Sequence, residues 1–121
     1  MPVIADIVKI DAPASAVAGG TVSVDVNVKN ISTSDQLLTV TAVYDSTYFL
    51  SGAAYATVLP GKSVTFRGSF IMPSKNVGVW AWSWYWDGSK WVNDDTMYKD
   101  IALDVGSPVF DNFAIGEYVK V

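Results

Sequence analysis

Five tryptophans are the residues of this sequence best suited to binding a ligand. Trp80, Trp82, Trp84 and Trp86 occupy every second position of one segment, and Trp91 follows a short polar loop. Side chains at period two project from one face of a β-strand, so the first four indoles are expected on the same face. Indoles stack on the apolar faces of sugar rings or anchor a protein interface, and all five are therefore candidate binding residues.

The direction in which these indoles point is open from the sequence. They could fill the core against Val24, Val26 and Phe66, because tryptophan is highly buried on average. They could instead form an exposed platform, or run from the core to an exposed rim. The opposite face of the segment is smaller and mostly apolar, so it could also be the inner one; it comprises Val77, Val79, Ala81, Ser83 and Tyr85.

Trp86 and Trp91 flank the loop 87–90, and they are expected to form a cross-strand aromatic pair. Oxygen-bearing side chains that calcium could use lie in the same region: Asp87, Asn93, Asp94 and Asp95. Their spacing does not match an EF-hand loop, and Asp and Asn favour turns for backbone reasons alone. Neither a metal site nor a cofactor is therefore expected.

Catalysis has few candidate residues in this chain. Without His or Cys, the usual nucleophile and general-base arrangements cannot form. Only carboxylate pairs such as Asp45 with Asp94 or Asp95 remain, and nothing in their spacing brings them together. The sequence therefore predicts a protein that is not an enzyme.

Charge and hydropathy limit the kinds of partner that this chain is expected to bind. The formal charge is −4, and the 8 basic residues are scattered, so a nucleic-acid partner is not expected. No apolar run approaches the ~18 residues needed to span a bilayer, and the N-terminus lacks the pattern of an export signal. An extracellular, cell-surface or virion location is still the expectation for the kind of module described below.

The elements that must position the tryptophans are strands. Apolar and polar residues alternate between Gly, Pro, Asn and Asp turns, which predicts an all-β, immunoglobulin-like antiparallel sandwich of about seven strands. Gly68 indicates a bulge or a close backbone approach, and Ser51-Gly52 a turn. The expected strands span residues 4–11, 21–30, 36–45, 55–59, 62–72, 77–86 and 96–105, within a domain of residues 1–107.

Three segments carry a resemblance to a known family. They are Ala12-Pro13, the run from Gly19-Gly20 through Val22, Val24, Val26 and Val28 to Asn30, and Leu59-Pro60-Gly61-Lys62-Ser63-Val64. Over about residues 5 to 105 the sequence resembles the CARDB and fibronectin-III-like modules of prokaryotic surface proteins. The resemblance implies a non-catalytic accessory, spacer or adhesion module, often repeated in tandem.

The tail of residues 108–121 is expected to be an extra or exchanged strand. Residues 115–121 repeat the pattern of residues 4–10, by chance or as the first strand of a following repeat. Such a strand could pair with the sheet edge of a neighbouring protomer. Its candidate assembly residues are Phe110, Phe113, Ile115, Tyr118 and Val119.

Two functions are expected in this order. The first is a structural or adhesive module that makes protein–protein contacts in a larger extracellular or virion-like assembly, through sheet edges, the tail and the aromatic strand. The alternative is a carbohydrate-binding module that uses exposed tryptophans.

Overall fold

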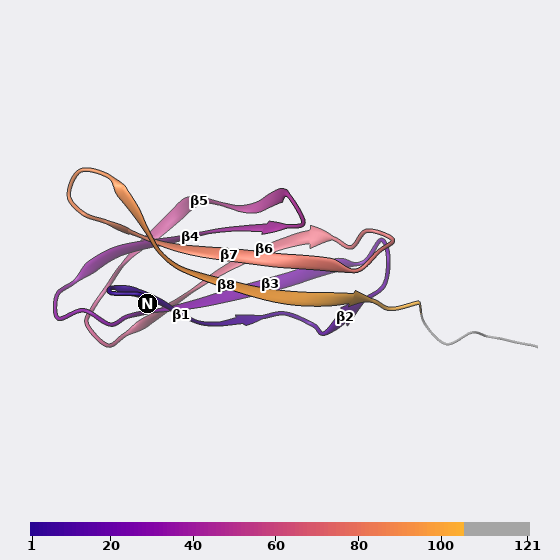
Figure 1. The fold of residues 1–121 in the computed structure, drawn as a ribbon, viewed down its shortest axis with the longest axis horizontal. Helices are drawn as coiled ribbons and strands as arrows, with labels where there is room; N and C mark the ends of the chain where they lie inside the picture. The colour runs from indigo at the N-terminus through magenta and orange to yellow at the C-terminus, as the bar shows by residue number, and fades with distance from the viewer. Residues whose placement is uncertain (106–121) are drawn as a thin grey trace, which may run out of the picture.

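The computed structural model describes residues 1–105, which form eight strands in two packed sheets (Figure 1). The three-stranded sheet has the order β1-β3-β6, and the five-stranded sheet has the order β2-β8-β7-β4-β5. The strands are β1 (Ala5–Asp11), β2 (Ser15–Ala16), β3 (Thr21–Asn30), β4 (Gln36–Tyr44), β5 (Thr47–Val58), β6 (Ser63–Ile71), β7 (Val77–Trp86) and β8 (Trp91–Leu103). The expected all-β, immunoglobulin-like sandwich is confirmed.

The chain changes sheets near its start. β1 pairs antiparallel with β3, and after Pro13 the short β2 pairs in parallel with β8 of the other sheet. A break is expected there because proline lacks the N–H that a continuous ladder needs. Among residues 1–105 there is no helix long and apolar enough to cross a membrane.

The core lies between the two sheets and consists of alternating residues of each strand. In β3 the inward row is Val22, Val24, Val26 and Val28, each at most 1% exposed. The facing residues of β4 and β7 are small or branched, including Leu38, Val40, Val79 and Ala81. The alternation in the sequence predicts these rows correctly, because successive side chains of a strand point to opposite faces.

The edge strand β5 differs from its expected form. The sequence predicts a turn at Ser51-Gly52 and a short strand at 55–59, but β5 is one strand of 12 residues that pairs with β4. The glycine instead lies in a bulge: Thr41 faces Ser51 and Thr39 faces Tyr55, so β5 has extra residues between them. A left-handed glycine suits a bulge as well as a turn, which explains the error.

Gly68 of β6 marks a close approach, as expected. A Cβ atom on Gly68 would lie 2.7 Å from the Phe49 ring and 2.8 Å from Leu50, so only glycine lets β5 cross here. The two sheets are thereby closed along the β5–β6 side.

Two carboxylates of β8 hold the N-terminal segment and β1 against the other sheet. Asp94 Oδ2 accepts hydrogen bonds from the backbone N–H groups of Ile4 at 2.8 Å and Ala5 at 2.6 Å, and Asp94 Oδ1 accepts one from Val3 at 3.1 Å. Asp95 Oδ2 accepts another from Ile7 N–H at 2.8 Å. The N–H groups of Ala5 and Ile7 belong to β1, and those of Val3 and Ile4 directly precede it, on the side where a further strand would otherwise pair. The side chains of Asp94 and Asp95 in β8 therefore supply the hydrogen-bond acceptors for these N–H groups.

We predict that Asp94→Ala lowers the free energy of unfolding by about 2 kcal/mol, because hydrogen bonds to a charged acceptor are worth about 1.5–3 kcal/mol and several N–H groups lose their partner. Asp35→Ala, in the exposed turn before β4, is the matched control, and it should change stability by less than about 0.5 kcal/mol. Urea unfolding measures both. Equal losses in the two variants would show that the carboxylate does not hold β1.

Candidate aromatic binding face

The tryptophan row of β7 points away from the core. The residues of the alternating inner face, Val77, Val79, Ala81 and Ser83, are at most 3% exposed. On the other face Trp80 is 42% and Trp86 is 38% exposed, while Trp82 and Trp84 are half-buried. Of the arrangements left open by the sequence, the packing of these indoles against Val24, Val26 and Phe66 is therefore wrong, and the outward arrangement is the observed one.

Aromatic side chains of two neighbouring elements join this row. Cross-strand partners share a face, so Tyr98 and Trp91 of β8 lie beside Trp80 and Trp86, and Tyr55 of β5 lies opposite Thr39 of β4. We call the following set the aromatic face: Tyr55, Trp80, Trp82, Trp84, Trp86, Trp91 and Tyr98. All seven residues project from the outer side of the five-stranded sheet.

The rings of the aromatic face contact one another along the sheet. Ring centroids are 4.7 Å apart between Trp80 and Tyr98, 6.5 Å between Trp80 and Trp82, and 5.5 Å between Trp86 and Trp91. The expected cross-strand pair Trp86–Trp91 is thus confirmed. Such contacts restrict ring motion before a ligand arrives, which lowers the entropy lost on binding.

Polar contacts fix the ring orientations further. The indole Nε1–H of Trp84 donates a hydrogen bond to Thr41 Oγ1 of β4 at 2.9 Å, so the ring leans over β4. Tyr98 covers Gly78, where any side chain would collide with its ring, and donates its hydroxyl proton to Asp100. The bond to Asp100 raises the pKa of Tyr98. Tyr98 is therefore a neutral hydrogen-bond donor at physiological pH.

A bulge in β8 brings Trp91 across the sheet. Ser83 faces Asp95 and Trp84 faces Asn93, so Asp94 is an extra residue without a partner on β7. Bulges bend a strand and increase its twist. Figure 1 shows the β7–β8 hairpin curving toward β5, and the centroid of the Trp91 ring lies 6.1 Å from that of Tyr55 on β5. Residues of two strands that are not neighbours in the sheet are thus brought into contact.

The hairpin tip is itself ordered by Asp87. The carboxylate accepts hydrogen bonds from the N–H groups of Ser89 and Lys90, both at 2.9 Å. These bonds lower the pKa of Asp87. The expected loop at 87–90 joins the paired strands β7 and β8, with Gly88 at a φ of 102°.

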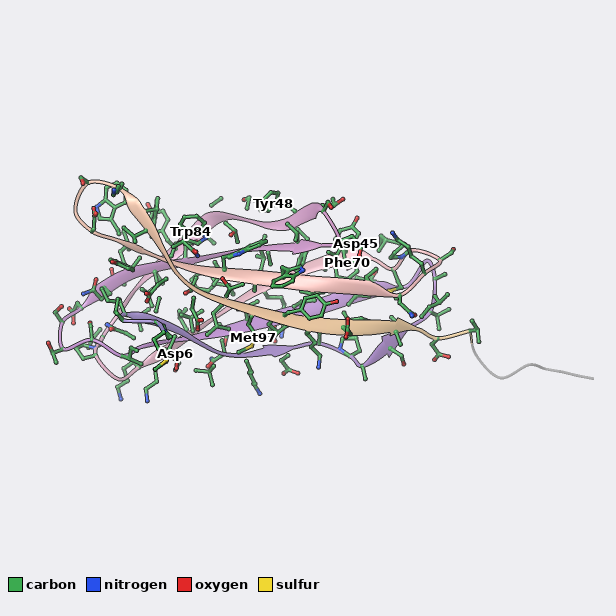
Figure 2. All side chains as sticks on the ribbon, in the orientation of Figure 1. Asp6, Asp45, Tyr48, Phe70, Trp84 and Met97 are labelled. Atoms are coloured by element: carbon green, nitrogen blue, oxygen red, sulfur yellow. The ribbon has the colours of Figure 1, made fainter. Side chains whose placement is uncertain are left out.

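A hollow of about 210 Å³, open to solvent, lies where Trp91 approaches β5. Its lining residues are Thr39, Thr41, Ser51, Gly52, Trp84 and Trp91. Thr39 forms part of the floor and donates its hydroxyl proton to the carbonyls of the β5 bulge, at Gly52 and Ala54. The bulge thus makes one wall and the indoles make another. Figure 2 shows Trp84 on the side of β7 that faces β4 and β5.

The candidate carboxylates are not brought together. Asp45 pairs with Lys75 at 3.2 Å and lies at the opposite end of the sandwich from Asp6, which neighbours Asp95 (Figure 2). The Asp87 carboxylate accepts hydrogen bonds within its own turn, and the Asp94 carboxylate accepts hydrogen bonds from the N-terminal segment. Within residues 1–105 no group of three or more acidic side chains could hold a metal ion. The candidate pair of Asp45 with Asp94 or Asp95, which the residue spacing provides no reason to expect, does not form.

The tail lies outside the described residues. This applies to the expected strand at 108–121 and to its candidate residues Phe110, Phe113, Ile115, Tyr118 and Val119. Their role in assembly stays a prediction.

Sequence reasoning missed Tyr55, Tyr98 and the hollow. The sequence does contain a signal for Tyr98, because Thr96, Tyr98 and Asp100 occupy every second position of an expected strand and so share one face. The position of Tyr55 depends on the bulge at Gly52, and the hollow depends on the bulge at Asp94. Neither bulge has a distinct pattern in the sequence.

The fold and the aromatic face define an immunoglobulin-like β-sandwich module. No protein-family model matches the sequence, and no curated protein matches it. Among solved structures, it is similar to a CARDB domain from Pyrococcus furiosus in complex with di-metal ions, with a TM-score of 0.64 and 12% identity over 83% of this chain and 94% of that one. The resemblance to CARDB modules is thereby confirmed at the level of the fold.

Two further structures agree on the fold. One is a chain of the complex between zinc 2-glycoprotein and prolactin-inducible protein from human seminal plasma, with a TM-score of 0.59 and 11% identity over 83% of this chain and 96% of that one. The other is the native conformation of E. coli alpha-2-macroglobulin, with a TM-score of 0.59 and 17% identity over 84% of this chain and 7% of that one.

We predict that Asp6→Asn stabilises the fold at pH 7. Burial raises the pKa of Asp6, and the nearby Asp95 carboxylate raises it further. The folded state then binds the proton more tightly than the unfolded chain, so stability falls as the pH rises through the raised pKa. Asparagine mimics the protonated form, with a gain below about 1 kcal/mol because the group is partly solvated.

Unfolding measured between about pH 4 and 7 checks this prediction, since ordinary aspartates titrate near the lower limit. The gain should shrink as the pH falls. A variant less stable than the natural chain at pH 7 would contradict the predicted repulsion.

We also predict that Gly52→Ala is more destabilising than Gly61→Ala. Both glycines have positive φ, 83° and 75°, so both alanines suffer a left-handed strain of about 1–2 kcal/mol. A Cβ on Gly52 would also lie 3.1 Å from Thr41 Cγ2, whereas a Cβ on Gly61 meets nothing within 4 Å. Only Gly52→Ala should then shift the indole N–H resonance of Trp84, which is bonded to Thr41. Equal destabilisation with an unmoved resonance would refute the packing at the hollow.

Proposed function

We propose that this domain is a non-catalytic binding module that holds carbohydrate on its aromatic face. The observation that carries the proposal is the outward direction of the indoles of β7. A monomeric protein rarely exposes a large contiguous apolar patch without a binding purpose. Pyranose rings have apolar C–H faces that pack on indoles and polar edges that hydrogen-bond around them.

The non-catalytic part of the proposal is supported by the chemistry of the hollow. Its lining consists of threonine, serine, glycine and tryptophan residues. None of these titrates near neutral pH, so the hollow has no general acid or base. Its chemistry suits holding a ligand.

A second candidate is the protein–protein contact module of a larger extracellular or virion-like assembly. Exposed Trp and Tyr are typical anchors of protein interfaces, and the tail could add a strand to a partner. Two described sheet edges count against strand addition, however. In β1 the N–H groups of Ala5 and Ile7 are bonded to Asp94 and Asp95, and β5 is interrupted by its bulge. The aromatic face is therefore the surface we favour for either partner.

We predict that the full chain binds at least one member of a panel of soluble hexasaccharides built from glucose, xylose or mannose. Replacing Trp82 by alanine should weaken binding about tenfold, since the loss of roughly 60 Å² of apolar contact at about 25 cal/mol per Å² is worth about 1.5 kcal/mol. Ile71→Ala is the matched control, because Ile71 is 58% exposed on β6, in the three-stranded sheet and away from the aromatic face. Isothermal titration and circular dichroism report affinity and fold.

Absence of binding to the whole panel would refute the carbohydrate function. If in addition the natural chain forms oligomers that Trp82→Ala dissociates, the protein-contact function would replace it.

A further inference from the structure

We infer that the hollow between Trp84, Trp91 and the β5 bulge is a subsite for one uncharged pyranose ring. This inference rests on the proposed function and adds to it the position and the charge class of the sugar.

Size limits the occupant to a small group. The hollow of about 210 Å³ is smaller than the ~300–1,000 Å³ of pockets that enclose drug-sized ligands. A single ring with its hydroxyl groups suits this space, and the open side leaves room for a chain to continue along the aromatic face.

The lining pairs apolar surfaces with neutral hydroxyl groups. Trp84 and Trp91 supply indole surface, while Thr41 and Ser51 supply hydroxyls. Thr41 Oγ1 already accepts the Trp84 indole proton at 2.9 Å, so its own proton can be donated to a ligand oxygen. An aliphatic or proline side chain in the hollow would cover these hydroxyls without bonding them, which is unfavourable. A hydroxylated ring can meet both kinds of surface.

Electrostatics exclude charged sugars. None of the six lining residues is charged, so an ionised ligand would lose hydration without gaining an opposite charge. The net charge of −4 adds a general repulsion toward anions. The subsite therefore favours neutral hexoses and pentoses over uronic acids.

The position of Trp91 makes the subsite depend on the hairpin. Trp91 approaches β5 because the β8 bulge bends the hairpin, and its ring contacts that of Tyr55 on β5. The Asp87 turn holds the hairpin tip. The subsite is thus formed before a ligand binds.

The test is an NMR titration of the full chain that follows the five indole N–H resonances. The probes are the neutral hexasaccharides named above and oligogalacturonate of the same length. Neutral sugar should shift the Trp84 and Trp91 resonances most, and oligogalacturonate should bind at least tenfold more weakly. Trp91→Ala should weaken neutral binding at least tenfold, whereas Ile71→Ala, on the other sheet, should leave it unchanged.

A gain-of-function variant complements these losses. Ser51→Lys introduces a cation at the wall of the hollow, and it should raise the affinity for oligogalacturonate at least fivefold relative to the natural chain. Unchanged uronate affinity in a folded Ser51→Lys variant would overturn the subsite.

The outcomes separate this inference from the proposed function. Shifts confined to Trp80, Trp82 or Trp86 would overturn the subsite and leave the carbohydrate function intact. Equal affinity for neutral and uronate chains would overturn the charge class. No shift with any sugar would overturn both.

Discussion

The carboxylate of Asp94 accepts hydrogen bonds from three consecutive backbone N–H groups, those of Val3, Ile4 and Ala5. It can do so because Asp94 is the extra residue of a bulge in β8, which frees its side chain from the alternation of the strand. The same bulge bends the β7–β8 hairpin and carries Trp91 toward Tyr55. One irregular residue therefore links the closed edge of the sandwich to the shape of the aromatic face.

The inward and outward sides of β7 follow from the space between the sheets. The valine row of β3 already fills one side of the core, and the inner residues Val79, Ala81 and Ser83 match it in size. Four indoles on that side would overpack the core, which is destabilising. Outside, the rings cover side chains of β4, where Thr39 is 3% and Val43 is 6% exposed. The aromatic face is thus a packed layer and at the same time an accessible surface.

Local patterns in the sequence were sufficient for much of this architecture. Alternation predicts β3 and β7 with their observed bounds and places four tryptophans on one face, because the period of a strand is set by its backbone. It does not decide which face is inward, because both faces of β7 are apolar and the choice depends on β3, a distant part of the chain. The bulges at Asp94 and Gly52 are equally non-local, since each is defined by the pairing of two strands. The hollow depends on both, and the sequence therefore does not predict it.

The placement of Trp91 at the hollow depends on the bulge at Asp94. The most direct test of this dependence is deletion of Asp94, which leaves Asn93 opposite Trp84 and Asp95 opposite Ser83 but removes the extra residue. The nuclear Overhauser contacts between the rings of Trp91 and Tyr55 should be present in the natural chain and absent from the folded deletion variant. Contacts of equal intensity in both proteins would show that the hairpin bends without the bulge, and the account would be wrong.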